Sequence, residues 1–171
     1  MKYALLTLII VISSAFNSSS YTGGVNFQDE TWSAAVKHAK AVNKPIFAFV
    51  RTSTCRISAR MDQIFHDPKV AAFFNANFVC VQIFTENALD NIRASNWGAT
   101  GVPTFFFFKP NKEKIYTFSG FREADAVIKE GETALKMMGL KSNPGKIDPN
   151  APKNKKDAKD DDDEDEKEDK E

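Results

Sequence analysis

The chain has 171 residues, 23 basic and 23 acidic side chains, and only two cysteines. This length allows one small domain with its own core. Nucleic-acid binding is disfavoured, because no dense Lys/Arg stripe with interleaved aromatics occurs in the part expected to fold. The balanced charge hides an asymmetry, since residues 157–171 contain eleven acids and three lysines.

The N-terminus predicts a secretory signal peptide over residues 1–20. Lys2 precedes a short apolar run at 4–12, and small residues follow, with plausible cleavage after Ala15 or Ser20. The run is short for a membrane span, although an N-terminal anchor is the alternative. We therefore expect an extracytoplasmic protein (periplasmic or secreted, or in the ER lumen of a eukaryote) with no membrane contact after signal removal.

Residues 22–140 predict one domain in which helices and strands alternate. Apolar residues at helical spacing indicate helices, and short apolar runs between turn residues indicate strands. The expected helices cover residues 30–42, 58–65, 69–74, 88–95 and 122–138. The expected strands cover residues 46–50, 78–84, 104–108 and 114–118. Helix-linked strands followed by a hairpin imply an α/β fold with a central mixed sheet and helices on both faces.

The C-terminal residues 141–171 predict a disordered tail. They lack aromatic residues and are rich in Lys, Asp and Glu, so they cannot bury enough apolar surface to offset the entropy of ordering. The carboxylates could bind Ca²⁺ weakly, but they show no EF-hand order. A solvated or partner-contacting tail is the favoured interpretation.

Reactive chemistry is expected at Cys55, between the strand at 46–50 and the following helix. A thiol at the first turn of a helix faces backbone N–H groups and the positive end of the helix dipole. Arg51, Arg56 and Arg60 are close in sequence. These features predict a lowered pKa and a nucleophilic thiolate. An inert, half-buried cysteine is the alternative.

Two motifs make the chain resemble the thioredoxin superfamily over residues 22–138. They are Cys55-Arg56-Ile57-Ser58 and Gly101-Val102-Pro103-Thr104, at the family's spacing. The resemblance is closest to secreted or periplasmic thioredoxin-like proteins with an extra Asp-Pro-x-Val helix, a group that includes small ER-resident and anterior-gradient types. The other segments that carry it are Asn43-Lys44-Pro45, Met61, Asp67-Pro68-Lys69-Val70 and Asn77-Phe78-Val79.

The resemblance implies a thioredoxin-like fold and assigns roles to the residues of both motifs. Cys55 and Ser58 are the expected catalytic pair, and Val102, Pro103 and Arg56 are the expected substrate-binding residues. Pro103 is expected to be cis, beside the sulfur, with a trans proline at a strand start as the alternative. No cofactor and no metal site are expected, because no His/Cys/Asp spacing suits zinc.

Three departures from the family pattern bear on the chemistry. Ser58 replaces the resolving cysteine, so its hydroxyl can hydrogen-bond a thiolate but cannot resolve a mixed disulfide. Thr54 replaces the aromatic residue before the nucleophile. Phe49 replaces the buried acid that assists proton transfer to the second cysteine. Catalysis by an internal dithiol is therefore not expected.

The sequence leaves three functional hypotheses open. The leading one is a monothiol protein in which Cys55 forms mixed disulfides with client proteins or glutathione, in isomerisation, retention or quality control. The rival is a non-catalytic binding module that uses the Pro103 groove and the charged tail. The third is a dithiol reductase with Cys80 as resolving thiol, which we disfavour because Cys80 lies in an apolar strand and is expected to be a separate buried thiol.

Overall fold

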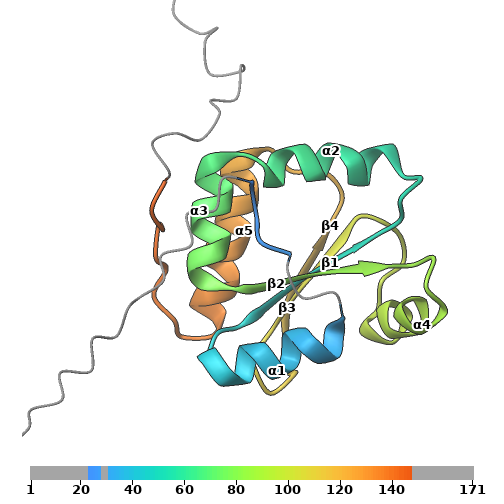
Figure 1. The fold of residues 1–171 in the computed structure, drawn as a ribbon, viewed down its shortest axis with the longest axis horizontal. Helices are drawn as coiled ribbons and strands as arrows, with labels where there is room; N and C mark the ends of the chain where they lie inside the picture. The colour runs from blue at the N-terminus through green and yellow to red at the C-terminus, as the bar shows by residue number, and fades with distance from the viewer. Residues whose placement is uncertain (1–22, 28–30, 148–171) are drawn as a thin grey trace, which may run out of the picture.

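The computed structural model describes residues 23–27 and 31–147. The expected signal peptide at 1–20 and most of the expected tail lie outside the described residues. Five helices and four strands are described (Figure 1). In chain order they are α1 Trp32–Val42, β1 Ile46–Arg51, α2 Arg56–Phe65, α3 Pro68–Asn77, β2 Val79–Phe84, α4 Ala88–Trp97, β3 Thr104–Phe108, β4 Lys114–Ser119 and α5 Ala124–Met137.

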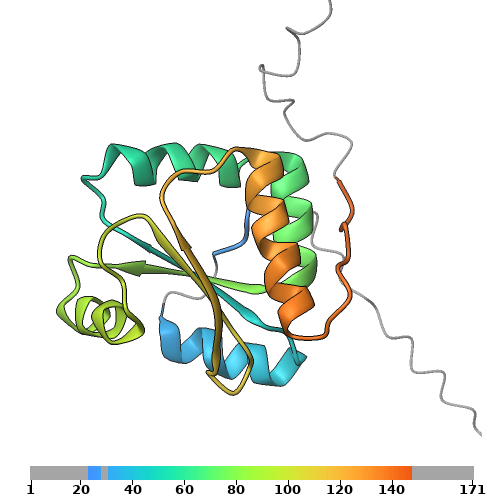
Figure 2. The same ribbon diagram turned by 180° about the vertical axis from the view of Figure 1, so that it is seen from behind.

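The strands form one mixed sheet in the order β2-β1-β3-β4. β1 and β2 are parallel, whereas β3 is antiparallel to both β1 and β4. Helices α2, α3 and α5 cover one face, and α1 and α4 cover the other (Figures 1 and 2). The predicted fold class, a mixed sheet with helices on both faces, is confirmed.

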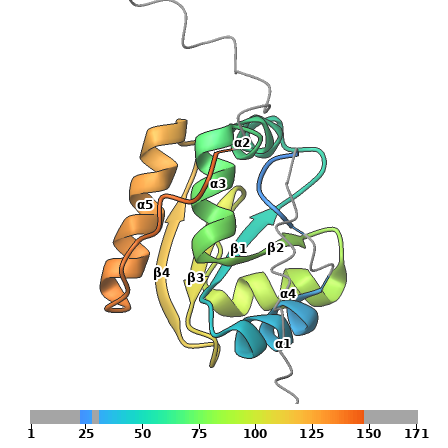
Figure 3. The same ribbon diagram turned by 60° about the vertical axis from the view of Figure 1, so that its left-hand side comes forward.

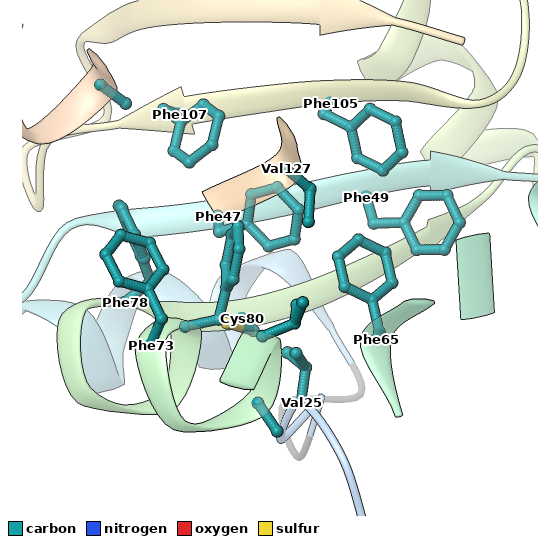
Figure 4. Close-up of a cluster of buried hydrophobic side chains, with 14 of the residues drawn as sticks. Val25, Phe47, Phe49, Phe65, Phe73, Phe78, Cys80, Phe105, Phe107 and Val127 are labelled. Carbon is teal, nitrogen blue, oxygen red and sulfur yellow. The ribbon is translucent and has the colours of Figure 1, made fainter. Parts of the chain in front are cut away.

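The sheet is buried on both faces because alternate residues of β3 enter two separate cores. Phe105 and Phe107 point toward α2, α3 and α5, where they pack with phenylalanines of β1 such as Phe47 (Figure 4). Phe106 and Phe108 lie in the second core, against α1 and α4. All four rings are at most 1% exposed. The interpretation of residues 105–108 as a strand buried on both faces is therefore confirmed.

All five helices differ from the sequence prediction by one to three residues at one or both ends. Helix α2 begins at Arg56, two residues earlier than expected, so that Cys55 is its N-cap residue. Helix α3 extends to Asn77 rather than residue 74, and the buried Asn77 side chain donates to the Phe73 carbonyl one turn earlier at 2.7 Å. The Asp67 side chain caps α3 by accepting hydrogen bonds from the N–H groups of Lys69 and Val70.

The first residues of the expected tail, 141–147, run without regular secondary structure beside α3 (Figure 3). Asn77 of α3 holds this stretch: its Nδ2 donates to the Asn143 carbonyl at 2.6 Å, and its Oδ1 accepts from the Asn143 N–H at 2.9 Å. Gly145 lies against the helix backbone so closely that a Cβ there would come within 2.1 Å of the Ala72 carbonyl oxygen. Residues 148–171 lie outside the description, so disorder there stays a prediction.

Within residues 23–27 and 31–147, the longest helix has 14 residues. No helix in these ranges is long and apolar enough to cross a membrane.

Candidate functional site

The corner between β1 and α2 places Cys55 at the entrance to a helix. After β1 ends at Arg51, a turn closed by the Cys55 N–H on the Thr52 carbonyl (3.4 Å) leads into α2. Cys55 has extended backbone angles and its side chain makes no capping hydrogen bond. The half-buried thiol therefore stays available for chemistry at the positive end of the helix.

The surroundings of Cys55 lower its pKa from the ordinary thiol value. The largest cause is the Ser58 backbone N–H, followed by the Ser58 hydroxyl, and both stabilise the thiolate. Partial burial acts in the opposite direction, while the Ile57 N–H and the positive charge of Arg51 add to the lowering. This direction agrees with the expectation of an activated thiol.

Ser58 is fully buried one helical turn after Cys55. Within the described residues its hydroxyl has no hydrogen-bond partner. The hydroxyl is thus available to the sulfur, and the hydrogen bond that it gives to the thiolate is the second largest cause of the lowered pKa of Cys55.

The second motif lies directly beside the sulfur. The Val102–Pro103 peptide bond is cis, which is the isomer implied by the resemblance. The Cys55 thiol donates to the Val102 carbonyl over 3.8 Å. The loop is fixed from both sides, because the Gly120 N–H donates to the Pro103 carbonyl at 2.9 Å and the Thr104 hydroxyl to the Gly101 carbonyl at 2.7 Å. Cys55, Ser58 and Val102–Pro103 are therefore brought together in the structure.

Arg56, the third expected substrate-binding residue, has a different setting. It is the first residue of α2 and its side chain is exposed. It is not among the groups that shift the pKa of Cys55. A role for Arg56 in binding stays a prediction.

Glu86 is a residue of the site that the sequence reasoning missed. Its carboxylate, in the loop after β2, accepts hydrogen bonds from the Thr52 hydroxyl at 2.7 Å and from the Ser53 N–H and hydroxyl at 2.5 and 2.6 Å. The hydrogen bonds from Ser53, and then the one from Thr52, lower the pKa of Glu86 to about 2. The carboxylate thus holds the loop that leads into Cys55.

The charged pair Arg51–Asp62 beneath α2 was also missed. The position of the family's buried acid is filled by Phe49, which is fully buried. An acid comes instead from α2, where Asp62 pairs with Arg51 of β1. Gln82 of β2 donates to the other carboxylate oxygen of Asp62 at 3.5 Å.

Cys80 lies away from this corner, in the core between the sheet and α3 (Figure 4). It is 3% exposed and, like Cys55, is not in a disulfide. Cys80 pairs with Phe47 in register, four residues along β1 from Arg51. Four strand residues span about 13 Å, so Cys80 lies about this far along the sheet from the end of β1, where the turn to Cys55 begins. A disulfide needs its Cα atoms within about 7 Å of each other. This separation argues against Cys80 as the resolving thiol.

The described part of the chain contains no group of three or more His, Cys, Asp or Glu side chains that could hold a metal ion. The expectation of weak Ca²⁺ binding concerns carboxylates at 157–171, outside the described residues.

Comparisons with known proteins give the same fold. A sequence model of a family described as thioredoxin-like matches residues 26–110. Among solved structures, "DsbH Oxidoreductase" has a TM-score of 0.58 at 20% identity, covering 71% of this chain and 92% of that one. A proposed disulphide isomerase from Bacteroides thetaiotaomicron has a TM-score of 0.61 at 24% identity, covering 68% and 98%.

A thioredoxin from Thermus thermophilus has a TM-score of 0.57 at 20% identity, covering 63% of this chain and 87% of its own. No curated protein gives a significant sequence match. At these identities the structural likeness establishes the fold.

Proposed function

We propose that this chain, which has a thioredoxin-like fold, forms mixed disulfides with cysteine-containing client proteins, or with glutathione, through Cys55. The observation that carries the proposal is the state of this thiol. It is half-buried at the start of α2, its pKa is lowered by Ser58, and it lies 3.8 Å from the carbonyl of Val102 before the cis proline. The relatives named as an oxidoreductase and a proposed disulphide isomerase support a thiol–disulfide role in general.

The proposed reaction is an exchange that conserves the number of thiols and disulfides. The Cys55 thiolate attacks one sulfur of a client disulfide or of oxidised glutathione. A bond forms between Cys55 and that sulfur, the original S–S bond breaks, and the second sulfur leaves as a thiolate. The hydrogen bonds from Ser58 stabilise the attacking thiolate, and the client segment lies along Val102 and Pro103.

Release requires a thiol from outside the chain. Ser58 cannot attack a disulfide, and Cys80 is buried in the core. A second client thiol would release an isomerised client, whereas glutathione would release the client as a glutathione mixed disulfide and restore the Cys55 thiol. A slow release suits isomerisation, retention or quality control better than bulk reduction. An extracytoplasmic location, proposed from the predicted signal peptide at 1–20, is one where client disulfides persist.

The test uses the full mature chain, oxidised glutathione and a peptide disulfide, with intact mass measured over time at about pH 6.5. Wild type should form the adduct faster folded than in denaturant, Cys55→Ala should form none at this site, and Cys80→Ala should behave as wild type. Ser58→Cys should shorten the lifetime of the adduct, because a second sulfur then attacks the mixed disulfide and forms an internal disulfide with Cys55.

Equal capture of clients by wild type and Cys55→Ala would contradict the proposal and favour the binding module. That alternative draws support from Phe49, which leaves the corner without the family's buried acid. It predicts that alkylation of Cys55 leaves client binding unchanged.

A further inference from the structure

We propose that the exposed side chains of Leu89 and Ile92 on α4 form a docking surface for protein clients, which binds apolar residues of an unfolded client segment whose cysteine reacts with Cys55. The inference rests on the proposed function and deepens it, because it names the class of client. Glutathione carries no large apolar side chain, so the two kinds of partner that the proposed function allows should behave differently at this surface.

Half of the large exposed hydrophobic side chains among the described residues lie at the end of the molecule that carries Cys55. Leu89 is 71% and Ile92 59% exposed, and Ile57 in the first turn of α2 and Phe84 at the end of β2 are 46% and 37% exposed. Helix α4 lies at the same end of the molecule as the start of α2 (Figures 1 and 2). The other large exposed hydrophobics are at the ends of α1 and α5 and in the residues after α5.

The outer face of α4 is apolar and carries no net charge. Leu89 and Ile92 are three positions apart and therefore lie on one face of the helix, whereas the inner face packs through the buried Ala94. The charged side chains of α4, Asp90 and Arg93, pair with each other. Because exposed clusters of large apolar side chains mark sites of interaction, this face is suited to an apolar partner rather than to a charged one.

Hydrogen bonds join the start of α4 to the loop that carries Cys55. Glu86, three residues before Leu89, accepts from the Thr52 hydroxyl at 2.7 Å and from the Ser53 N–H at 2.5 Å. Ser53 in turn lies two residues before Cys55. At about 3.5 Å per residue, these five steps of chain add at most about 17 Å to the bonded contact. The docking surface is therefore within reach of a short segment whose cysteine lies at Cys55.

The other end of α4 leads to the second part of the site. The helix ends at Trp97, and Gly98 at its C-cap has a positive φ of 93°, which turns the chain out of the helix. The loop that follows contains Val102, whose carbonyl lies 3.8 Å from the Cys55 sulfur and which precedes the cis proline. Both ends of α4 are thus attached to the reactive corner, so the position of the docking surface relative to the sulfur is fixed.

Only an extended polypeptide can occupy Cys55 and α4 at the same time. An extended chain rises about 3.3 Å per residue, so about six client residues beyond the reacting cysteine span the distance to Leu89 and Ile92. Glutathione has one residue on either side of its sulfur and is too short. Folded proteins bury most of their large apolar side chains, whereas unfolded chains expose them. The surface therefore favours unfolded clients, whose disulfides are still to be rearranged.

The experiment measures, by intact mass, how fast Cys55 of the full mature chain forms adducts with three disulfides. These are oxidised glutathione, a disulfide-linked peptide dimer with about six residues, mainly Leu and Val, on each side of the cysteine, and the same dimer with Ser in their place. Wild type should react about tenfold faster with the apolar dimer than with the Ser dimer, less than full burial of two such side chains would give. Leu89→Ser/Ile92→Ser should lose this preference and keep the wild-type rate with oxidised glutathione. Val42→Ser/Met137→Ser, at exposed apolar positions ending α1 and α5, is the matched control and should keep the preference.

Equal rates of wild type with the two peptide dimers, or a preference that survives in Leu89→Ser/Ile92→Ser, would overturn the inference while glutathione adducts leave the proposed function standing. Absence of Cys55 adducts with all three disulfides would refute the proposed function and this inference with it. A wild-type dimer in sedimentation velocity that Leu89→Ser/Ile92→Ser abolishes would assign the surface to a second copy of the chain and also overturn the inference. Should the double variant not fold, Leu89→Ser alone should reduce the preference, and an unchanged preference overturns the inference.

Discussion

The lowered pKa of Cys55 comes mainly from the first turn of α2, and no buried acid of the family's kind lies at the position of Phe49. The N–H and hydroxyl of Ser58 are the two largest causes of its lowered pKa, and both come from the residue that replaces a second cysteine. Phe49 occupies the position where an acid would assist that second cysteine. Ser58 therefore still supplies hydrogen bonds that stabilise the Cys55 thiolate, but it lacks the sulfur that would attack a mixed disulfide and release the client.

Glu86 makes a prediction about pH at the residue scale. Its pKa is lowered to about 2 in the folded chain by hydrogen bonds from Ser53 and Thr52, against about 4.3 for an unperturbed glutamate. A lowered pKa means that the carboxylate stabilises the fold above about pH 4.3, and that this contribution is lost as the pH falls toward 2. The difference in Tm between wild type and Glu86→Gln should therefore be largest near neutral pH and vanish near pH 2.

Thermal unfolding followed by circular dichroism between about pH 2 and 7 checks this prediction. Glu132→Gln, at an exposed position of α5, is the control for the loss of one carboxylate. If the Tm difference between wild type and Glu86→Gln increased as the pH falls, the hydrogen bonds from Ser53 and Thr52 would not be what stabilises the Glu86 carboxylate in the folded chain.

At the scale of elements, α3 serves as a support for residues 141–147. The side chain of Asn77 also donates to the Phe73 carbonyl at 2.7 Å, which fixes its amide for the paired hydrogen bonds with Asn143. Gly145 has a positive φ of 75° and approaches the Ala72 carbonyl too closely for a side chain. This stretch therefore depends on one asparagine and one glycine, and not on apolar burial.

Removing Asn77 should release residues 141–147 from α3. Asn77→Ala loses both hydrogen bonds to Asn143 and should lower the free energy of unfolding by about 1–3 kcal/mol. In a chain ending at Leu140 the same substitution should cost less, because the partner backbone is already gone. Urea denaturation of the four chains gives the coupling, and hydrogen exchange of residues 141–147 gives an independent measure. If Asn77→Ala lowered the free energy of unfolding equally in the full chain and in the chain ending at Leu140, Asn77 would stabilise the fold only through its hydrogen bond to the Phe73 carbonyl.

The sequence predicted elements well and long-range polar contacts poorly. Every strand and helix was expected near its observed place, because apolar spacing reports directly on burial. Asn77 and Asn143 are 66 residues apart, and Glu86 is 33 residues from Ser53. Composition gives no signal for such pairs. Disorder was predicted for residues 141–171 together from their overall composition, and that prediction could not detect the hydrogen bonds between Asn143 and Asn77 at the start of this segment.

At the scale of the whole molecule, the sheet separates two cores that share its strands. The larger core lies under α2, α3 and α5 and contains most of the phenylalanines, including Phe47, Phe105 and Phe107 (Figure 4). The smaller core lies under α1 and α4 and contains Phe106 and Phe108. Strands β1 and β3 contribute side chains to both cores. The corner at Cys55 and the loop at Pro103, which adjoin these strands, are therefore fixed by packing on both faces of the sheet. This rigidity is what keeps the sulfur beside Val102.

Substitutions at two neighbouring residues of β3 can test whether both cores contribute to the stability of the fold. Phe106 and Phe107 point to opposite faces, and each is at most 1% exposed. Phe106→Ala and Phe107→Ala should therefore each lower the free energy of unfolding by about 3–5 kcal/mol, as expected for deletion of a buried ring. Leu89→Ala, at a side chain 71% exposed on α4, is the control and should cost no more than about 0.5 kcal/mol. Urea denaturation at 25 °C measures all three.

Where the alanine variants do not fold, Phe106→Leu and Phe107→Leu give the same comparison with smaller losses. A cost confined to Phe107 would show that the face under α1 and α4 is loosely packed, and that one core alone positions the Cys55 corner. Similar costs on the two faces would instead mean that a mutation on either side of the sheet can disturb the sulfur and Val102. The alkylation rate of Cys55 in the two leucine variants would then change together with their stability.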